Sequence, residues 1–152
     1  LHSPERIVIA GRILEEMAQI QRLDDEMTRA TANSVKAVAL YADLLRSDPD
    51  VLDGDIMRRA RAIVDTLNDA ELTWDDSFAL FGVFESLGFY DRAEDALWTL
   101  AESGFDRERV FDAGDIFYDR LRKLDEETLA EGGLPHEEVI EGRDAWTRMK
   151  TE

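Results

Sequence analysis

Apolar residues recur every three or four positions along almost the whole chain, and this spacing constrains the fold more than any other feature. One turn of an α-helix takes about 3.6 residues, so this period gathers the apolar side chains on one helical face. A β-strand would alternate apolar and polar residues in steps of two, and no segment sustains that alternation. The sequence therefore predicts an all-α fold of about seven to eight helices.

Capping residues and helix breakers indicate where these helices begin and end. Ser3 is suited to cap the first helix, with Pro4 at its first position. Thr73, followed three residues later by Asp76, forms an approximate capping box for the fourth. The expected helices cover residues 2–21, 27–45, 53–70, 73–88, 90–100, 106–124, 125–133 and 134–150.

Three of these helices carry informative apolar patterns. In the first, the apolar stripe runs through Ile7, Ala10, Ile13, Leu14, Met17 and Ile20. In the sixth, the residues expected to point inward are Val110, Ala113, Ile116, Phe117 and Leu121. The fourth is apolar around most of its circumference, which is typical of a helix at the centre of a domain. Only Ala79, Gly82 and Ser86 leave it a strip of small residues, where another helix could approach closely.

Charge is abundant and uneven. The net charge of the chain is −17, and residues 65–115 alone hold 14 acidic and 3 basic groups. Such a field repels phosphate backbones and anionic lipid, so neither nucleic acid nor a membrane surface is an expected partner. The acidic excess is either a generic solvated surface or a site for a protein with a basic surface, and both interpretations stay open.

Length and composition fit one domain, covering residues 1–152, with 44% hydrophobic and 35% charged residues. The chain has no cysteine, so it offers neither a thiol nucleophile nor a thiolate metal site. The longest apolar runs are far shorter than the ~20 residues of a membrane-spanning helix. No signal-peptide pattern is visible from Leu1 onward, and a reducing cytoplasm is the expected location.

Patterns that carry chemistry are missing. The acidic stretch at 47–56 suggests calcium, but an EF-hand loop starting at Asp48 would have Asp53 in place of its glycine and Arg59 in place of its last glutamate. His2 and His136 are the only histidines, too few for a zinc cluster. No nucleophile elbow or phosphate loop is present. We therefore expect no cofactor, no metal and no catalysis.

The stretch "SLGFYDRAEDALWTL" at 86–100 carries the one informative motif. Gly88 stands where a helical C-cap requires positive φ, and it is followed by Tyr90, Asp91, Ala93 and then Leu97 and Leu100. With the helix before it, this stretch resembles a tetratricopeptide-repeat hairpin over residues 74–103. The resemblance implies stacked helical hairpins, with Ala93 allowing the two helices to cross closely and Tyr90 filling the turn. It also implies a binding or scaffolding module.

The resemblance does not extend into a regular array. A weaker match at 37–49 places Ala37, Tyr41, Leu44 and Pro49 at the family's spacing. Ala37 and Ala93 are much further apart than one such repeat, so an irregular stack is expected. Separately, the segment at 125–142 resembles part of an uncharacterised bacterial family of helical domains.

A partner-binding face is expected around the predicted hairpin, because the acidic excess is concentrated there. Trp98 allows two interpretations: it packs against the next helix near 110–117, or it is an exposed aromatic anchor among acidic residues. The residues expected to face a partner are Asp75, Asp76, Tyr90, Asp91, Glu94, Asp95 and Trp98.

The sequence thus predicts a non-catalytic protein-interaction or scaffolding module. The alternative is a structural homodimer that pairs through an apolar stripe on its first or last helix, with Trp146 and Met149 as contributors. An enzyme of unknown type is a remote third reading.

Overall fold

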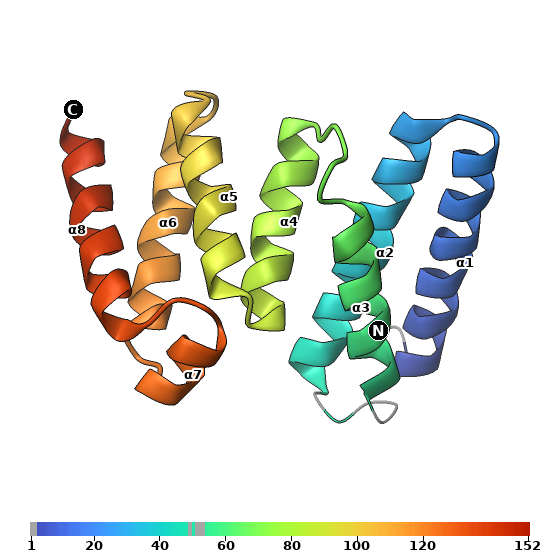
Figure 1. The fold of residues 1–152 in the computed structure, drawn as a ribbon, viewed down its shortest axis with the longest axis horizontal. Helices are drawn as coiled ribbons and strands as arrows, with labels where there is room; N and C mark the ends of the chain where they lie inside the picture. Colours follow the sequence, from blue (N-terminus) through green and yellow to red (C-terminus); the bar gives the residue numbers. More distant parts are fainter. Residues whose placement is uncertain (1–2, 49, 51–53) are drawn as a thin grey trace. The chain divides into compact units, whose positions relative to one another are not determined.

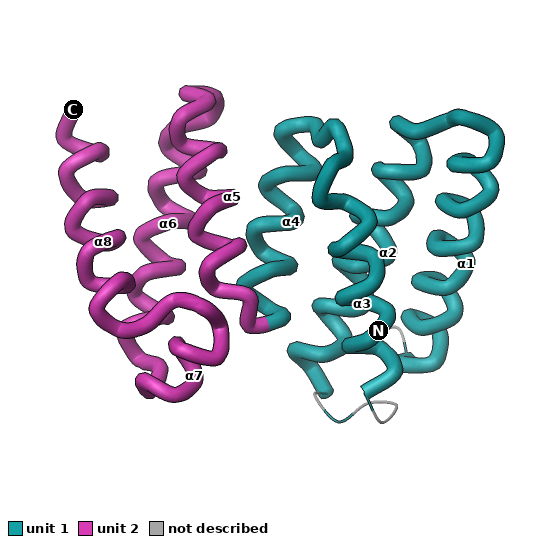
Figure 2. Tube along the Cα trace, in the orientation of Figure 1, with its two compact units in different colours: residues 1–87 teal, residues 88–152 magenta. Residues whose placement is uncertain are grey.

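The computed structural model describes residues 3–48, 50 and 54–152. Over these residues the chain forms eight α-helices and no strand, which confirms the all-α prediction (Figure 1). Backbone contacts divide the chain into two compact units, Leu1–Leu87 and Gly88–Glu152 (Figure 2). The single-domain organisation stays a prediction.

Unit 1 is built around its second helix, which contacts the other three. Small side chains at Ala30, Ser34 and Ala37 are fully or almost fully buried and allow neighbouring helices to approach it closely. The sequence predicted the fourth helix as the core, and Phe81 and Phe84 are indeed buried there. Within this unit, however, the second helix is the central one. The four helices are α1 (Pro4–Leu23), α2 (Met27–Ser47), α3 (Asp55–Thr66) and α4 (Trp74–Leu87).

α1 turns a different face inward from the one that its apolar stripe suggested. Its buried residues are Val8, Gly11 and Ala18. Gly11 lies against the ring of Tyr41, and a Cβ atom at this position would be 2.3 Å from Cε1 of that ring. The small residues on this face let α2 approach closely, so this face packs on α2. The bulkier stripe stays outside, with Ile13, Met17 and Ile20 exposed.

Unit 2 follows the same packing principle. Its helices are α5 (Tyr90–Glu102), α6 (Arg107–Leu121), α7 (Glu126–Glu131) and α8 (His136–Thr151). α6 contacts α5 and α8, while α7 contacts α8. Gly114 of α6 lies under the indole of Trp146, where a Cβ atom would be 2.2 Å from Cζ2. A missing side chain on one helix therefore makes room for the largest side chain of another.

Local sequence chemistry predicted most helix ends correctly. Ser3 caps α1 by accepting the backbone N–H of Arg6 at 3.4 Å, and Pro4 begins the helix. Gly88 has the predicted positive φ, at 77°. Three details were wrong: α3 ends at Thr66 rather than near Ala70, α6 ends at Leu121 rather than Leu124, and Ile116 is 51% exposed rather than inward.

The tetratricopeptide resemblance stays a prediction. Ala37, Tyr41, Leu44 and Ala93 are buried, which any packed helical domain would also require, and Pro49 lies outside the described residues. The two helices of the predicted hairpin, α4 and α5, fall in different units. Their close crossing at Ala93 therefore stays a prediction.

Candidate functional site

The seven residues predicted to face a partner are divided between the units. Asp75 and Asp76 begin α4 in unit 1, and the other five lie on α5 in unit 2. Asp76 and Thr73 form the predicted capping box: the backbone N–H of Asp76 donates to Thr73 Oγ1 at 3.1 Å, and that of Thr73 donates to Asp76 Oδ2 at 3.4 Å. Asp76 is therefore used for helix capping, while Asp75 is exposed.

Tyr90 and Asp91 hold the beginning of α5 against the glycines that end α7. The backbone N–H of Asp91 donates to the carbonyl of Gly132 at 3.1 Å. A Cβ atom at Gly132 would lie 2.2 Å from Cδ2 of Tyr90, and one at Gly133 would lie 2.8 Å from the Asp91 carboxyl carbon. Tyr90 thus packs on the glycine that follows α7, and its role in the turn between the hairpin helices stays a prediction.

Glu94 and Trp98 both point toward the hydroxyl of Tyr118. Tyr118 donates to Glu94 Oε1 at 2.5 Å and accepts the indole N–H of Trp98 at 3.1 Å. The ring of Trp98 also meets that of Trp146 edge-on, with centroids 5.4 Å apart. Trp98 therefore packs inside unit 2, as its packing interpretation predicts, and it is half-buried rather than an exposed anchor.

Burial changes the acid–base properties of this cluster. It raises the pKa of the Glu94 carboxyl, to which Asp95 and Glu138 add by repulsion, although the Tyr118 hydrogen bond opposes the shift. Burial and the adjacent Glu94 likewise raise the pKa of Tyr118. Gly142 makes this arrangement possible, because a Cβ atom there would lie 2.2 Å from Glu94 Oε1. Among the five residues on α5, only Asp91 and Asp95 remain exposed.

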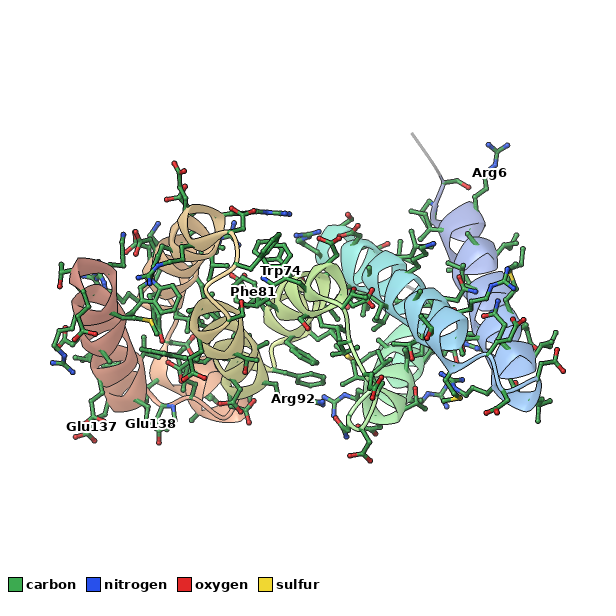
Figure 3. The ribbon with its side chains drawn as sticks, turned by 90° about the horizontal axis from the view of Figure 1, so that it is seen from above. Arg6, Trp74, Phe81, Arg92, Glu137 and Glu138 are labelled. Carbon is green, nitrogen blue, oxygen red and sulfur yellow. The ribbon has the colours of Figure 1, made fainter. Side chains whose placement is uncertain are left out.

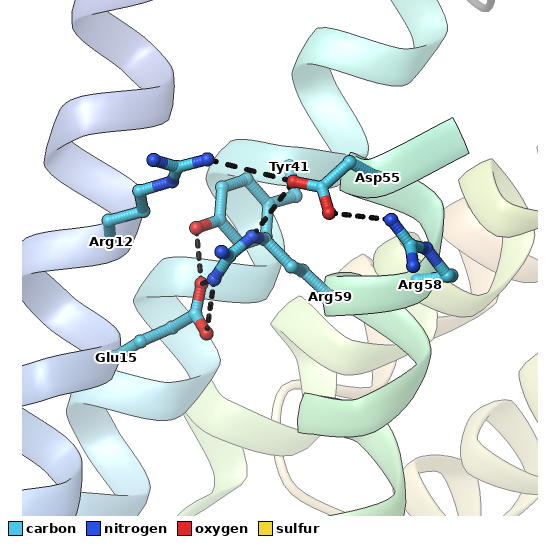
Figure 4. A network of polar contacts seen from close by, with 6 residues as sticks. All are labelled: Arg12, Glu15, Tyr41, Asp55, Arg58 and Arg59. Atoms are coloured by element: carbon cyan, nitrogen blue, oxygen red, sulfur yellow. Dashed lines mark hydrogen bonds and ion pairs between the residues drawn. The ribbon is translucent and has the colours of Figure 1, made fainter. Parts of the chain in front are cut away.

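Unit 1 contains a second tyrosine–glutamate pair that was not anticipated from the sequence. The buried hydroxyl of Tyr41 donates to Glu15 of α1, and Arg59 of α3 approaches the same carboxylate at 3.4 Å (Figure 4). Burial and the hydrogen bond to Glu15 raise the pKa of Tyr41. The pair thus links α1, α2 and α3.

The same network continues to Asp55, which three arginines surround. Arg59 Nε is 3.0 Å and Arg58 Nη2 is 2.9 Å from its oxygens, while Arg12 is more distant at 3.7 Å (Figure 4). The hydrogen bond from Arg59 lowers the pKa of Asp55. Arg58 and Arg59 thus pair with Asp55 within the same helix, three and four residues apart. These charges connect α1 with α3.

The outer face of α1 presents the largest run of exposed apolar side chains on one described helix. Single exposed apolar residues are ordinary, but these occupy consecutive turns of one face. At about 100° per residue, Ile9, Ile13 and Ile20 lie within about 40° of one another and opposite the buried face. The outer stripe consists of Ile9, Ile13, Met17, Ile20 and Leu23, whose exposed fractions are 57%, 54%, 43%, 56% and 82%.

α1 is thus apolar on two opposite faces, of which unit 1 covers only one. A helix with this composition is typical of a buried position. The apolar spacing of the sequence identified several of these residues, but it could not show which face of α1 would be exposed. Arg6 at the start of this helix points away from the ribbon (Figure 3).

The last helix offers less for a partner than the sequence suggested. Trp146 was expected to contribute to a dimer, but it is only 1% exposed, so this expectation was wrong. A cavity of about 430 Å³ lies beside α8, lined by Arg122, His136, Ile140, Arg143 and Asp144. Asp119 lies 3.1 Å from Arg143 and 3.8 Å from Arg122, and together with Asp144 of the lining it balances the two arginines. The cavity therefore has no excess charge with which to hold an ion.

Two searches of the described residues gave negative results. No group of three or more metal-binding side chains is placed to hold an ion in the part of the chain that the structure covers. No helix within the same residues is long and apolar enough to cross a membrane.

Comparison with known proteins places the chain in a family. A search of curated proteins found no match, and a search of solved structures found none. A family profile, described as a family of unknown function, matches residues 7–150 and so includes both the outer stripe of α1 and the segment at 125–142. Because this match covers nearly the whole chain, the protein belongs to that family of unknown function, DUF6483.

Proposed function

We propose that the protein is a non-catalytic interaction module that presents the outer face of α1 to another protein chain. The observation that supports this function is the outer stripe, in which Ile9, Ile13 and Ile20 are each more than half exposed. Burial of apolar surface is the main driving force of protein association, and exposed patches of this kind mark interaction sites. The absence of nucleophile and phosphate-binding motifs from the sequence supports the non-catalytic part of the proposal.

The acidic side of α5 is a weaker candidate for the partner surface. Glu94 and Trp98, its central members, already bind Tyr118 within unit 2. A basic partner would be left with Asp91 and Asp95, two exposed charges whose interactions salt would screen. We therefore propose α1 rather than α5 as the main partner surface. The proposed location is a reducing cytoplasm.

A paired-variant binding assay tests the proposal. Tagged wild-type protein and an Ile13→Asp/Ile20→Asp variant would be incubated with a lysate of the source cells, and bound proteins would be identified by mass spectrometry. Because both side chains are exposed, the variant should keep its helical circular dichroism and its melting temperature. We expect it to lose proteins that the wild type retains, including further copies of the chain itself.

A matched control separates a site-specific loss from a general effect of charge. Ile116 lies on α6 of unit 2 and is 51% exposed, close to the 54% of Ile13. Ile116→Asp should bind the same proteins as the wild type. Identical recovery by all three proteins would contradict the proposal.

A further inference from the structure

We infer that the outer stripe of α1 binds the same stripe of a second copy of the chain, with the two helices antiparallel and Ile9 opposite Ile20. This inference rests on the proposed function, because it names the partner of the same surface. Three features of α1 support it: its charge balance, the order of charges beside the stripe, and the availability of those charges.

The first feature is that α1 has no net charge, although the whole chain carries −17. The acidic residues of Pro4–Leu23 are Glu5, Glu15 and Glu16, and the basic residues are Arg6, Arg12 and Arg22. Two strongly acidic molecules repel each other over most of their surfaces. A neutral apolar helix gives them a face on which they can approach with the least repulsion.

The second feature is the order of charges along the two edges of the stripe. At about 100° per residue, Glu5, Arg12 and Glu16 lie on one edge, and Arg6 and Asp24 lie on the other. A two-fold axis perpendicular to both helices brings each edge against the same edge of the second copy. The charges on one edge therefore meet each other across the dimer.

Placing Ile9 opposite Ile20 fixes the axial positions of these charges. Along the helix axis, Arg12 is then offset from Glu16 of the second copy by about 1.5 Å, the rise of one residue. Arg6 has the same axial offset from Asp24 of the second copy. Each ion pair forms twice by symmetry. In a parallel pairing the two-fold axis would run along the helices and bring opposite edges together, so neither of these ion pairs would form. Both pairs therefore require the antiparallel dimer.

The third feature is that these charges are available. Within the described residues Arg6, Glu16 and Asp24 form no ion pair, and Arg6 points into solvent (Figure 3). Arg12 makes the longest of the three contacts to Asp55, at 3.7 Å, and its side chain is 52% exposed. It can turn to Glu16 of a second copy while Arg58 and Arg59 retain Asp55.

The size of the stripe sets the expected affinity. α1 has 20 residues and is thus about 30 Å long, so one helix pair buries less than the about 1,600 Å² of a standard interface. We expect a dimer that dissociates in the micromolar range. Sedimentation-equilibrium centrifugation over a wide range of concentrations should show a monomer–dimer equilibrium for the wild type. Ile13→Asp/Ile20→Asp should raise its dissociation constant by about 100-fold, and Ile116→Asp should not.

Cysteine cross-linking tests the register, because the natural chain contains no cysteine. We would mix an Ile9→Cys variant with an Ile20→Cys variant under mild oxidation and also oxidise each alone. The antiparallel register predicts disulfide-linked dimers in the mixture only. Identical positions would be about 16 Å apart along the axis, beyond the ~7 Å limit between Cα atoms in a disulfide.

Charge reversal tests the ion pairs independently. Arg6→Glu should weaken the dimer by about 10-fold, because it opposes Asp24 of the second copy at two symmetric positions. Adding Asp24→Arg in the same chain should restore wild-type affinity. A weakened dimer that the double change does not restore would contradict the register.

The outcomes separate this inference from the proposed function. A wild type that stays monomeric at millimolar concentration, or a dimer unaffected by Ile13→Asp/Ile20→Asp, would overturn self-pairing through the outer stripe. Cross-linking of Ile9→Cys with itself would overturn the antiparallel register. The proposed function would survive the first result if the stripe variant still lost a different protein in the lysate assay. If the Ile13→Asp/Ile20→Asp variant kept both self-association and the binding of other proteins, both this inference and the proposed function would be contradicted.

Discussion

Tyr118 and Glu94 form a hydrogen bond of 2.5 Å inside unit 2, with the phenolic hydroxyl as donor. The same hydroxyl accepts the N–H of Trp98, so one oxygen atom connects two helices and satisfies two polar groups. We predict that Tyr118→Phe costs about 3 kcal/mol of unfolding free energy, because a carboxylate and an indole N–H both lose their partner. Urea unfolding followed by circular dichroism would measure it.

Tyr41→Phe is the matched comparison for this change. It removes the corresponding hydroxyl in unit 1, but Arg59 remains 3.4 Å from Glu15 and compensates the carboxylate. We therefore expect a smaller loss, about 1 kcal/mol. Equal losses for the two variants would show that the Trp98 contact adds nothing.

The raised pKa of Glu94 predicts a particular dependence of stability on pH. Between its ordinary value of 4.5 and its folded value, the folded chain binds more protons than the unfolded chain. The contribution of Glu94 to stability is therefore full below pH 4.5 and is lost as the pH rises through the folded pKa. We predict that Glu94→Gln, which keeps an oxygen acceptor for Tyr118, gains stability relative to the wild type as the pH is raised from about 4 to about 7.

Thermal unfolding across that pH range would test the prediction. Glu102→Gln, an exposed change on the same helix, is the control and should follow the wild-type curve. A constant difference between Glu94→Gln and the wild type at every pH would refute the effect of burial.

The glycines of unit 1 predict opposite responses to the same substitution. Gly11→Ala would place a methyl group 2.3 Å from the buried ring of Tyr41, and we expect it to lower the unfolding free energy by about 2 kcal/mol. Gly82→Ala meets nothing within 4 Å in the middle of α4, so it should stabilise by about 0.5–1 kcal/mol through helix propensity. Chemical denaturation of both variants would measure the difference. A loss for Gly82→Ala would indicate a close helix neighbour at that position.

Charge reversal on α5 separates the exposed acids from the structural one. We predict that Asp95→Lys changes stability by less than about 0.5 kcal/mol, because the side chain is exposed. Glu94→Lys should cost more than about 3 kcal/mol, because it places an unpaired cation against Tyr118. Melting temperatures would show the contrast, and only Asp95→Lys is then a fair test of a basic partner.

The sequence predicted features that local chemistry determines. Ser3, Thr73 and Gly88 each act on backbone groups within a few residues, and all three do what their positions indicated. The helical spacing of apolar residues likewise predicted each described helix, because this spacing depends only on residues that are close in sequence.

The buried face of α1 could not be predicted in this way. That helix has apolar residues on two opposite faces, and the choice between them depends on Gly11 meeting Tyr41 from another helix. The same holds for Trp98, whose partners Tyr118 and Trp146 lie on α6 and α8. Trp146 was misassigned to a dimer surface for this reason, since nothing near it in sequence shows that Gly114 makes room for it.

The distribution of the three indoles gives the protein its own optical reporters. Trp98 and Trp146 meet edge-on within unit 2, whereas Trp74 stacks on Phe78 within unit 1. Replacing Trp74 with phenylalanine would leave fluorescence emission from the second unit alone. The melting of the second unit can therefore be followed by its intrinsic light, without any attached dye.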